Sequence, residues 1–114
     1  MEEQKTIKIK KYKIEDNNFD NLKKLGFTSL GDGIYIHNFP CYRWHGFVTI
    51  TGRFVAYDDT KEIVIDVFQE DGRPYAPYYS NEKNNVLAIV RANIKKECEK
   101  CNISSYIVVQ KEKQ

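Results

Sequence analysis

The clearest structural signal of the chain lies in residues 47–69, which read FVTITGRFVAYDDTKEIVIDVFQ. Apolar residues alternate along both halves, so each half predicts a strand. In the first half Val48, Ile50, Phe54 and Ala56 share one face, but Phe47, Val55 and Tyr57 lie on the other, so both faces are expected to be partly covered. In the second half Ile63, Ile65 and Val67 share a face. Asp58-Asp59-Thr60-Lys61 is a turn signal between the two halves. A third alternating run follows Gly31-Asp32-Gly33 and is expected to end at Pro40, which completes an antiparallel three-strand meander.

The strongest helix signal follows this meander. An apolar stripe with spacings of 3, 4, 4 and 3 is formed by Leu87, Val90, Ile94, Cys98 and Cys101. Ser80 or Asn81 is the expected N-cap, Glu82 falls in the first turn, and Asn102 ends the helix. We therefore expect a long helix near residues 82–101 that packs across one face of the sheet.

Weaker signals flank these elements. Residues 5–14 predict a strand with a bulge near Lys10-Lys11. A short helix, capped by Asp16 or Asn17 and ended by Gly26, is expected from the spacing of Phe19, Leu22 and Leu25. Two prolines and three tyrosines in residues 73–79 favour an extended segment, and residues 106–109 predict an edge strand or a strand that joins a partner.

These elements define an α+β fold in one domain, residues 1–114, with a short charged tail at 111–114. The prediction is an antiparallel sheet of four to five strands around the central meander. One long C-terminal helix covers one face, and a short N-terminal helix completes the domain.

Composition limits the classes of function. The 114 residues carry a formal charge of only +2, so the total charge does not indicate a strongly basic nucleic-acid binder. The chain begins without a secretory pattern, and three cysteines are an odd number, so a cytoplasmic protein with no membrane segment is expected. Heavy use of Lys, Ile, Asn and Tyr suggests a low-GC bacterial or phage genome.

The sequence carries no strong catalytic motif. Gly31-Asp32-Gly33 lacks the third glycine of a dinucleotide fingerprint, and no Walker-type Gly-Lys-Ser/Thr occurs. Cys41 lies near His37 and His45, but nothing in the sequence orients a histidine as its base. We therefore expect a protein that is not an enzyme and holds no cofactor.

A zinc site is a minor alternative. Cys98 and Cys101 have the Cys-x2-Cys spacing, and Cys41 with His45 would complete a Cys3His set. Both paired cysteines continue the apolar stripe at the end of a helix, where the dipole opposes thiolate formation, so core packing is preferred.

Interface-type residues are densest between the first two strands of the meander. The expected partner-binding loop, centred on residues 39–45, comprises Tyr35, His37, Tyr42, Arg43, Trp44 and His45. Such side chains bury much area with little entropy loss, so a protein-binding accessory or inhibitor module is the first hypothesis. The same rings could equally close the open face of a small sheet.

The alternative is a single-stranded nucleic-acid binder, in which aromatic rings stack on bases and lysines meet phosphates. The lysines in question are Lys8, Lys10, Lys11, Lys13, Lys95, Lys96 and Lys100. The oligomeric state is not specified by any of these patterns.

Overall fold

The structure is a computed structural model that describes residues 6–14, 21–80 and 83–111. Six strands form one antiparallel sheet in the order β2-β3-β4-β5-β1-β6. Along the chain the elements are β1 (Thr6–Ile14), β2 (Thr28–Gly31), β3 (Ile34–Trp44), β4 (Phe47–Tyr57), β5 (Glu62–Gln69), α1 (Ala76–Ser80), α2 (Asn85–Lys100) and β6 (Ile103–Lys111). The α+β class is confirmed, with six strands in place of four to five.

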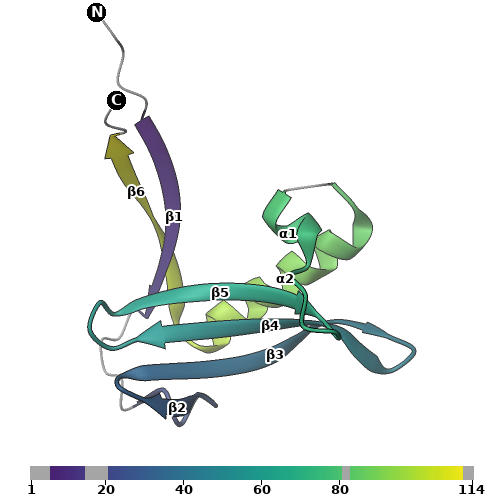
Figure 1. Ribbon diagram of the computed structural model, residues 1–114, viewed down its shortest axis with the longest axis horizontal. Coiled ribbons are helices and arrows are strands. Elements are labelled where there is room, and N and C mark those ends of the chain that lie inside the picture. Colours follow the sequence, from purple (N-terminus) through teal and green to yellow (C-terminus); the bar gives the residue numbers. More distant parts are fainter. Residues whose placement is uncertain (1–5, 15–20, 81–82, 112–114) are drawn as a thin grey trace, which may run out of the picture.

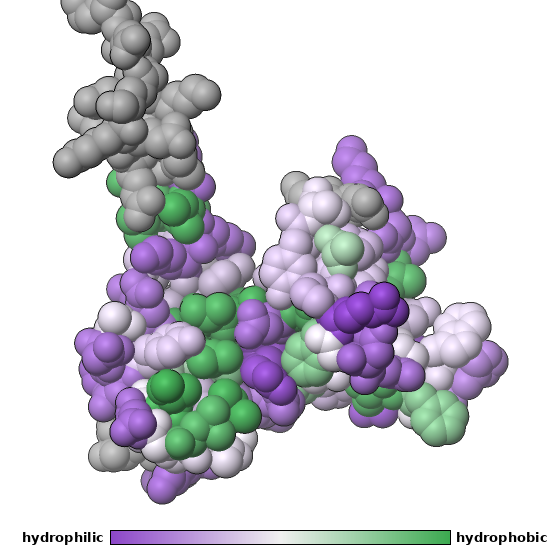
Figure 2. Space-filling model, viewed as in Figure 1, coloured by the Kyte–Doolittle hydropathy of each residue, from purple (hydrophilic) through white to green (hydrophobic). Residues whose placement is uncertain are grey.

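The predicted meander is present as β3, β4 and β5. Alternation along β4 buries Ile50, Gly52, Phe54 and Ala56, and the register places the last three opposite the buried residues Val67, Ile65 and Ile63 of β5. The opposite side chains of these strands are half-buried or exposed, because no helix in the described part of the chain covers that face. Figure 2 shows this open face, where apolar side chains gather over one end of β3–β5.

Helix α2 covers the other face of the sheet, behind the strands in Figure 1. Leu87, Val90, Ile94 and Cys98 of the predicted stripe are its buried residues. The Asn93 side-chain amide donates to the Cys41 carbonyl at 2.7 Å, which ties α2 to β3. The packing face of the helix is therefore as predicted.

The ends of α2 differ in part from the expectation. The N-cap is Asn84, whose side-chain oxygen accepts a hydrogen bond from the Leu87 N–H at 2.6 Å. Ser80 is not the cap because it ends α1, and the alternative cap at 81 and the expected first-turn residue at 82 lie outside the described residues. At the other end Asn102 adopts a left-handed φ of 57° directly after the helix, as expected.

Strand β3 continues through Pro40 to Trp44, so the predicted loop after Pro40 is wrong. Proline removes a backbone donor, but β2 pairs only with the first residues of β3, so Pro40 lies where β3 is an edge strand. The register with β4 shifts between Pro40 and Arg43, which absorbs the irregularity. The aromatic segment is therefore the arm of a long hairpin.

The terminal strands form a two-stranded ribbon. Strand β1 pairs with β6 from Thr6↔Lys111 to Ile14↔Ile103 without a register shift, so the predicted bulge is absent. Only Tyr12↔Ile63 and Lys13↔Glu62 join β1 to β5. Beyond that point the ribbon projects from the body in Figure 1, where neither face has a core to impose an alternating pattern.

Two further segments depart from the sequence pattern. Residues 21–26, the described part of the expected N-terminal helix, form turns that end at Gly26 with φ 101°, while the start of that segment lies outside the described residues. The segment after Gly72 is extended only to Tyr75, and then α1 begins, because proline is tolerated in a first helical turn.

Candidate functional site

The β3–β4 hairpin ends in a tightly fixed tip. Arg43 pairs with Val48 and Trp44 with Phe47, so the ladder continues up to the turn. His45 and Gly46 form the two-residue turn with φ values of 50° and 83°. Positive φ at both central positions matches the twist of paired strands, so the turn orients the side chains beside it. We call residues 43–48 the hairpin tip.

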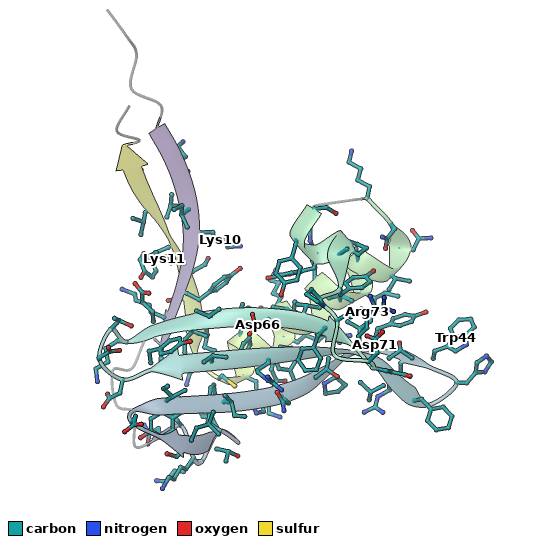
Figure 3. The ribbon with its side chains drawn as sticks, in the orientation of Figure 1. Lys10, Lys11, Trp44, Asp66, Asp71 and Arg73 are labelled. Carbon is teal, nitrogen blue, oxygen red and sulfur yellow. The ribbon has the colours of Figure 1, made fainter. Side chains whose placement is uncertain are left out.

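The hairpin tip exposes two large aromatic side chains. Trp44 is 60% exposed and Phe47 is 73% exposed. As directly paired residues of an antiparallel ladder they lie on the same face, and together they present roughly 300 Å² of surface. Figure 3 places Trp44 at the far end of the hairpin, away from the sheet and helices. Packing within the chain therefore does not account for these two rings.

Basic and acidic side chains lie near these rings. Arg43 and His45 are exposed, and the His45 ring packs edge-on against Trp44 with centroids 4.7 Å apart. Behind the tip, a hollow of about 310 Å³ is lined by Thr49, Gln69, Glu70 and Asp71. The Asp71 carboxylate accepts hydrogen bonds from the Arg73 backbone N–H at 3.0 Å and Nε at 2.6 Å, and these bonds lower its pKa. Glu70 and the Asp71–Arg73 ion pair therefore lie behind the tip.

The structure divides the predicted binding residues into two groups. Arg43, Trp44 and His45 are at the tip. Tyr35, His37 and Tyr42 are half-buried instead, and both tyrosines pack against the core. Phe39 between them is buried, with its ring 4.6 Å from that of Phe54. These inner residues close the core, which was the competing interpretation of the aromatic cluster.

His37 is held by two acceptors. Its Nδ1 lies 3.3 Å from the Gly26 carbonyl oxygen and its Nε2 lies 2.6 Å from Glu97 Oε2. The contact with Glu97 joins β3 to α2 through the His37 ring.

Cys101 completes a group of three metal-type ligands with His37 and Glu97, whose ligand atoms lie within 4.8 Å of one another. Two ligands of a tetrahedral zinc ion lie about 3.3 Å apart, because each is held at about 2.0–2.1 Å. The 2.6 Å distance between His37 Nε2 and Glu97 Oε2 is shorter than that and is a hydrogen bond. The spacing of the group therefore fits a hydrogen bond better than a metal ion.

The alternative zinc set of Cys41, His45, Cys98 and Cys101 is not assembled. His45 is exposed at the hairpin tip, while the three cysteines are free thiols in the core. Burial raises the pKa of Cys41 to about 12 and the pKa of Cys98 and Cys101 to about 11. Neutral thiols are poor ligands and poor nucleophiles, so the cysteines act as core residues.

Four of the candidate phosphate-binding lysines, those of β1, lie far from the aromatic tip. Lys8, Lys10, Lys11 and Lys13 are on β1, and Figure 3 shows Lys10 and Lys11 at the opposite end of the molecule from Trp44. Lys11 Nζ lies 3.2 Å from Glu62 Oε1, and Lys10 Nζ lies over the Tyr12 ring at 5.5 Å. The other three, Lys95, Lys96 and Lys100, are exposed on α2.

The sequence did not single out Phe47 or the acidic group behind it. The alternating pattern assigns Phe47 to a strand. Because the preceding strand was expected to end at Pro40, Trp44 was expected in a loop and not paired with Phe47. The available signal was His45-Gly46 between two β-prone runs, because a residue followed by glycine is typical of a two-residue hairpin turn.

A second hollow, of about 290 Å³, lies where the open face meets the segment after β5. Its lining is Arg53, Asp66, Val67, Phe68, Gly72, Pro74 and Tyr79. Arg53 Nε donates to Asn38 Oδ1 at 2.8 Å, and its guanidinium lies 4.9 Å from the Phe68 ring centroid. The Tyr79 hydroxyl accepts from the Val67 N–H at 3.0 Å. These interactions stabilise the segment against the sheet.

Comparison with known proteins bears on the fold alone. No protein-family model matches the chain, and no curated protein matches it. The structure is similar to the crystal structure of a DUF1831 family protein from Lactobacillus plantarum, with a TM-score of 0.59 and 11% sequence identity. The match covers 85% of this chain and 88% of the other, so the α+β architecture is shared over almost its whole length. No helix of the described residues has the length and apolar character needed to cross a membrane.

Proposed function

We propose that this chain is a non-enzymatic protein-binding module, acting as an accessory or inhibitor, that inserts Trp44 and Phe47 into an apolar pocket of a protein partner. The observation that carries the proposal is the 60% and 73% exposure of these rings on a two-residue turn. A fixed turn lowers the entropy that binding must offset, since the backbone is already ordered.

The chemistry of the tip indicates what the pocket offers. Arg43 and His45 flank the rings and are donors, so acceptors such as carboxylates or backbone carbonyls suit its rim. Burial of the roughly 300 Å² of ring surface would contribute about 7 kcal/mol before the costs of association. That contribution is large enough for Trp44 and Phe47 to dominate the affinity.

Single-stranded nucleic acid remains the second candidate, supported by the lysines of β1. Two features favour the protein partner. Glu70 lies behind the aromatic rings, where its charge repels phosphates, whereas the charge of Asp71 is paired with Arg73. The β1 lysines lie at the opposite end of a molecule whose longest extent is 57 Å, so a short strand cannot stack on the tip and meet them together.

The experiment is affinity capture with purified wild-type chain, Trp44→Ala, Phe47→Ala and Leu30→Ala, each with and without nuclease. Leu30 is the matched control, because it is 61% exposed on β2, away from the tip. We expect both tip variants to lose the captured protein, Leu30→Ala to retain it, and nuclease to change nothing. Truncation of a central aromatic anchor typically costs about 2 kcal/mol or more, which is roughly a 30-fold loss of affinity.

Thermal unfolding separates binding from folding. Both tip variants should unfold within a few degrees of wild type, because their side chains make little contact with the core. Unchanged capture by Trp44→Ala would contradict the proposal, and so would loss of capture after nuclease. A Trp44→Ala chain that does not fold would show that the tip closes the core instead.

A further inference from the structure

Strand β6 ends the sheet with an edge that no strand of the described residues pairs. It spans nine residues, Ile103–Lys111, on the outer side of the ribbon with β1. At about 3.4 Å per residue, this edge is about 30 Å long. An edge of that length presents a row of backbone donors and acceptors that can pair with another strand.

The side chains of β6 do not protect this edge. Ile107 is 57% exposed and Val109 is 56% exposed, on one face of the ribbon. Residues 103–110, ISSYIVVQ, contain no charge and no proline. Natural edge strands usually carry charges or proline that block pairing, and this strand lacks both over most of its length.

Two other edges of the sheet, those of β2 and β1, are less suited to pairing. Strand β2 has only four residues, and its register with β3 is irregular between Ser29 and Gly31. The outer edge of β1, free over most of its length, carries Lys8, Lys10, Lys11 and Lys13. A second copy brought to that edge would place lysines against lysines, which β6 avoids.

We infer that β6 pairs antiparallel with β6 of a second copy of this chain, so that two sheets join into one across a two-fold axis. Pairing centred on Ile107 places it opposite its own copy and Tyr106 opposite Val108 of the second copy. Ser105 then faces Val109, so every cross-strand pair in this stretch is neutral. A two-fold interface requires such self-complementarity, and the uncharged β6 edge supplies it.

The expected dimer is of moderate affinity. Strand pairing with a few apolar side chains buries less than the ~1,600 Å² of a standard stable interface. We therefore expect mainly dimer at about 1 mM and mainly monomer at about 1 µM. The net charge of +2 per chain opposes this association only weakly.

Sedimentation velocity over this concentration range tests the inference with wild type, Ile107→Lys, Val109→Lys and Leu30→Lys. Ile107→Lys places two cations opposite each other at the two-fold axis, so dimerisation should weaken at least tenfold. Leu30→Lys, an equally exposed site at the other sheet edge, should dimerise like wild type.

Hydrogen exchange of the wild-type chain provides a second measurement that needs no variant. Amides of residues 104–109 that point away from β1 should become protected as the concentration rises, whereas those of β2 should not. A chain that stays monomeric at 1 mM, or a dimer unaffected by both ribbon substitutions, would overturn the inference. So would equal weakening by Leu30→Lys, or concentration-dependent protection that appears in β2 instead of β6.

Discussion

Gly52 is the position where the structure predicts the largest effect from the smallest change. It lies inside β4, opposite Phe39, and is buried. A methyl group added there would lie 2.5 Å from Phe39 Cζ, 2.6 Å from Phe39 Cε2 and 2.7 Å from Cys41 Sγ. The Phe39 ring therefore occupies the space that a side chain at position 52 would need.

The loss of unfolding free energy expected for Gly52→Ala depends on whether the neighbouring side chains can move. The Phe39 ring packs against the rings of Phe54 and His37, with centroid distances of 4.6 Å and 5.9 Å. Cys41 is fully buried. Neither Phe39 nor Cys41 can therefore shift without disturbing the core. Overpacking a core typically lowers the free energy of unfolding by about 1–3 kcal/mol. Because the added methyl makes three contacts below 3 Å, we expect Gly52→Ala to cost about 3 kcal/mol. For a domain of this size the melting temperature should fall by roughly 10 °C or more.

Urea unfolding followed by circular dichroism measures this free energy. Gly72→Ala is the control, because nothing lies within 4 Å of its added methyl and only its positive φ of 87° opposes the substitution, at about 1 kcal/mol. Phe39→Leu shortens the clashing ring, so Gly52→Ala should cost less in that background, with a coupling energy of about 1 kcal/mol. A Gly52→Ala chain within about 0.5 kcal/mol of wild type would refute the packing argument.

Two other substitutions and one reagent extend these tests. Val90→Asp or Ile94→Asp should unfold the domain, because each buries an unpaired carboxylate under the sheet; a wild-type melting curve for either would show that α2 packs by another face. Burial raises the pKa of the thiols to about 11–12, so at pH 8 they are protonated and should react slowly with a disulfide reagent until denaturant is added. Fast reaction in the native protein would contradict their burial. Glu97→Gln should destabilise the fold by about 1–2 kcal/mol in urea unfolding, because it weakens the hydrogen bond to His37 that joins α2 to β3; an unchanged free energy would refute that contribution.

Sequence patterns predicted the elements in which one side faces the core. The β4 and β5 alternation and the α2 stripe were predicted correctly, because each element has one fully buried side, while the other side of β4 is half-buried. The sequence did not predict strand β2. All four of its residues are exposed, so no apolar alternation marks it, and only pairing with β3 holds it in the sheet. The two strands of the ribbon were predicted, with residues 106–109 as an edge strand, and only the bulge near Lys10-Lys11 was wrong. The broken alternation that suggested a bulge has a related cause, since only the Tyr12–Ile14 end of the ribbon reaches the core.

The candidate site was located in part. Arg43, Trp44 and His45 were identified by residue type, and they do lie together at the hairpin tip. His37 was grouped with them by proximity in sequence, but alternation along β3 turns it inward to Glu97, which is 60 residues away in the chain. Pairing across such a distance depends on how α2 docks on the sheet, and no local pattern encodes that docking.

The two proposed surfaces lie at opposite ends of the molecule, and this separation has a testable consequence. The hairpin tip is at one end of β3 and β4, whereas β6 lies at the far edge of the sheet (Figure 1). A dimer joined through β6 therefore leaves both tips free and makes the assembly bivalent. On a surface carrying many copies of the partner, Ile107→Lys should bind more weakly than wild type through lost avidity. With the partner free in solution the two should bind equally, whereas Trp44→Ala should fail in both formats.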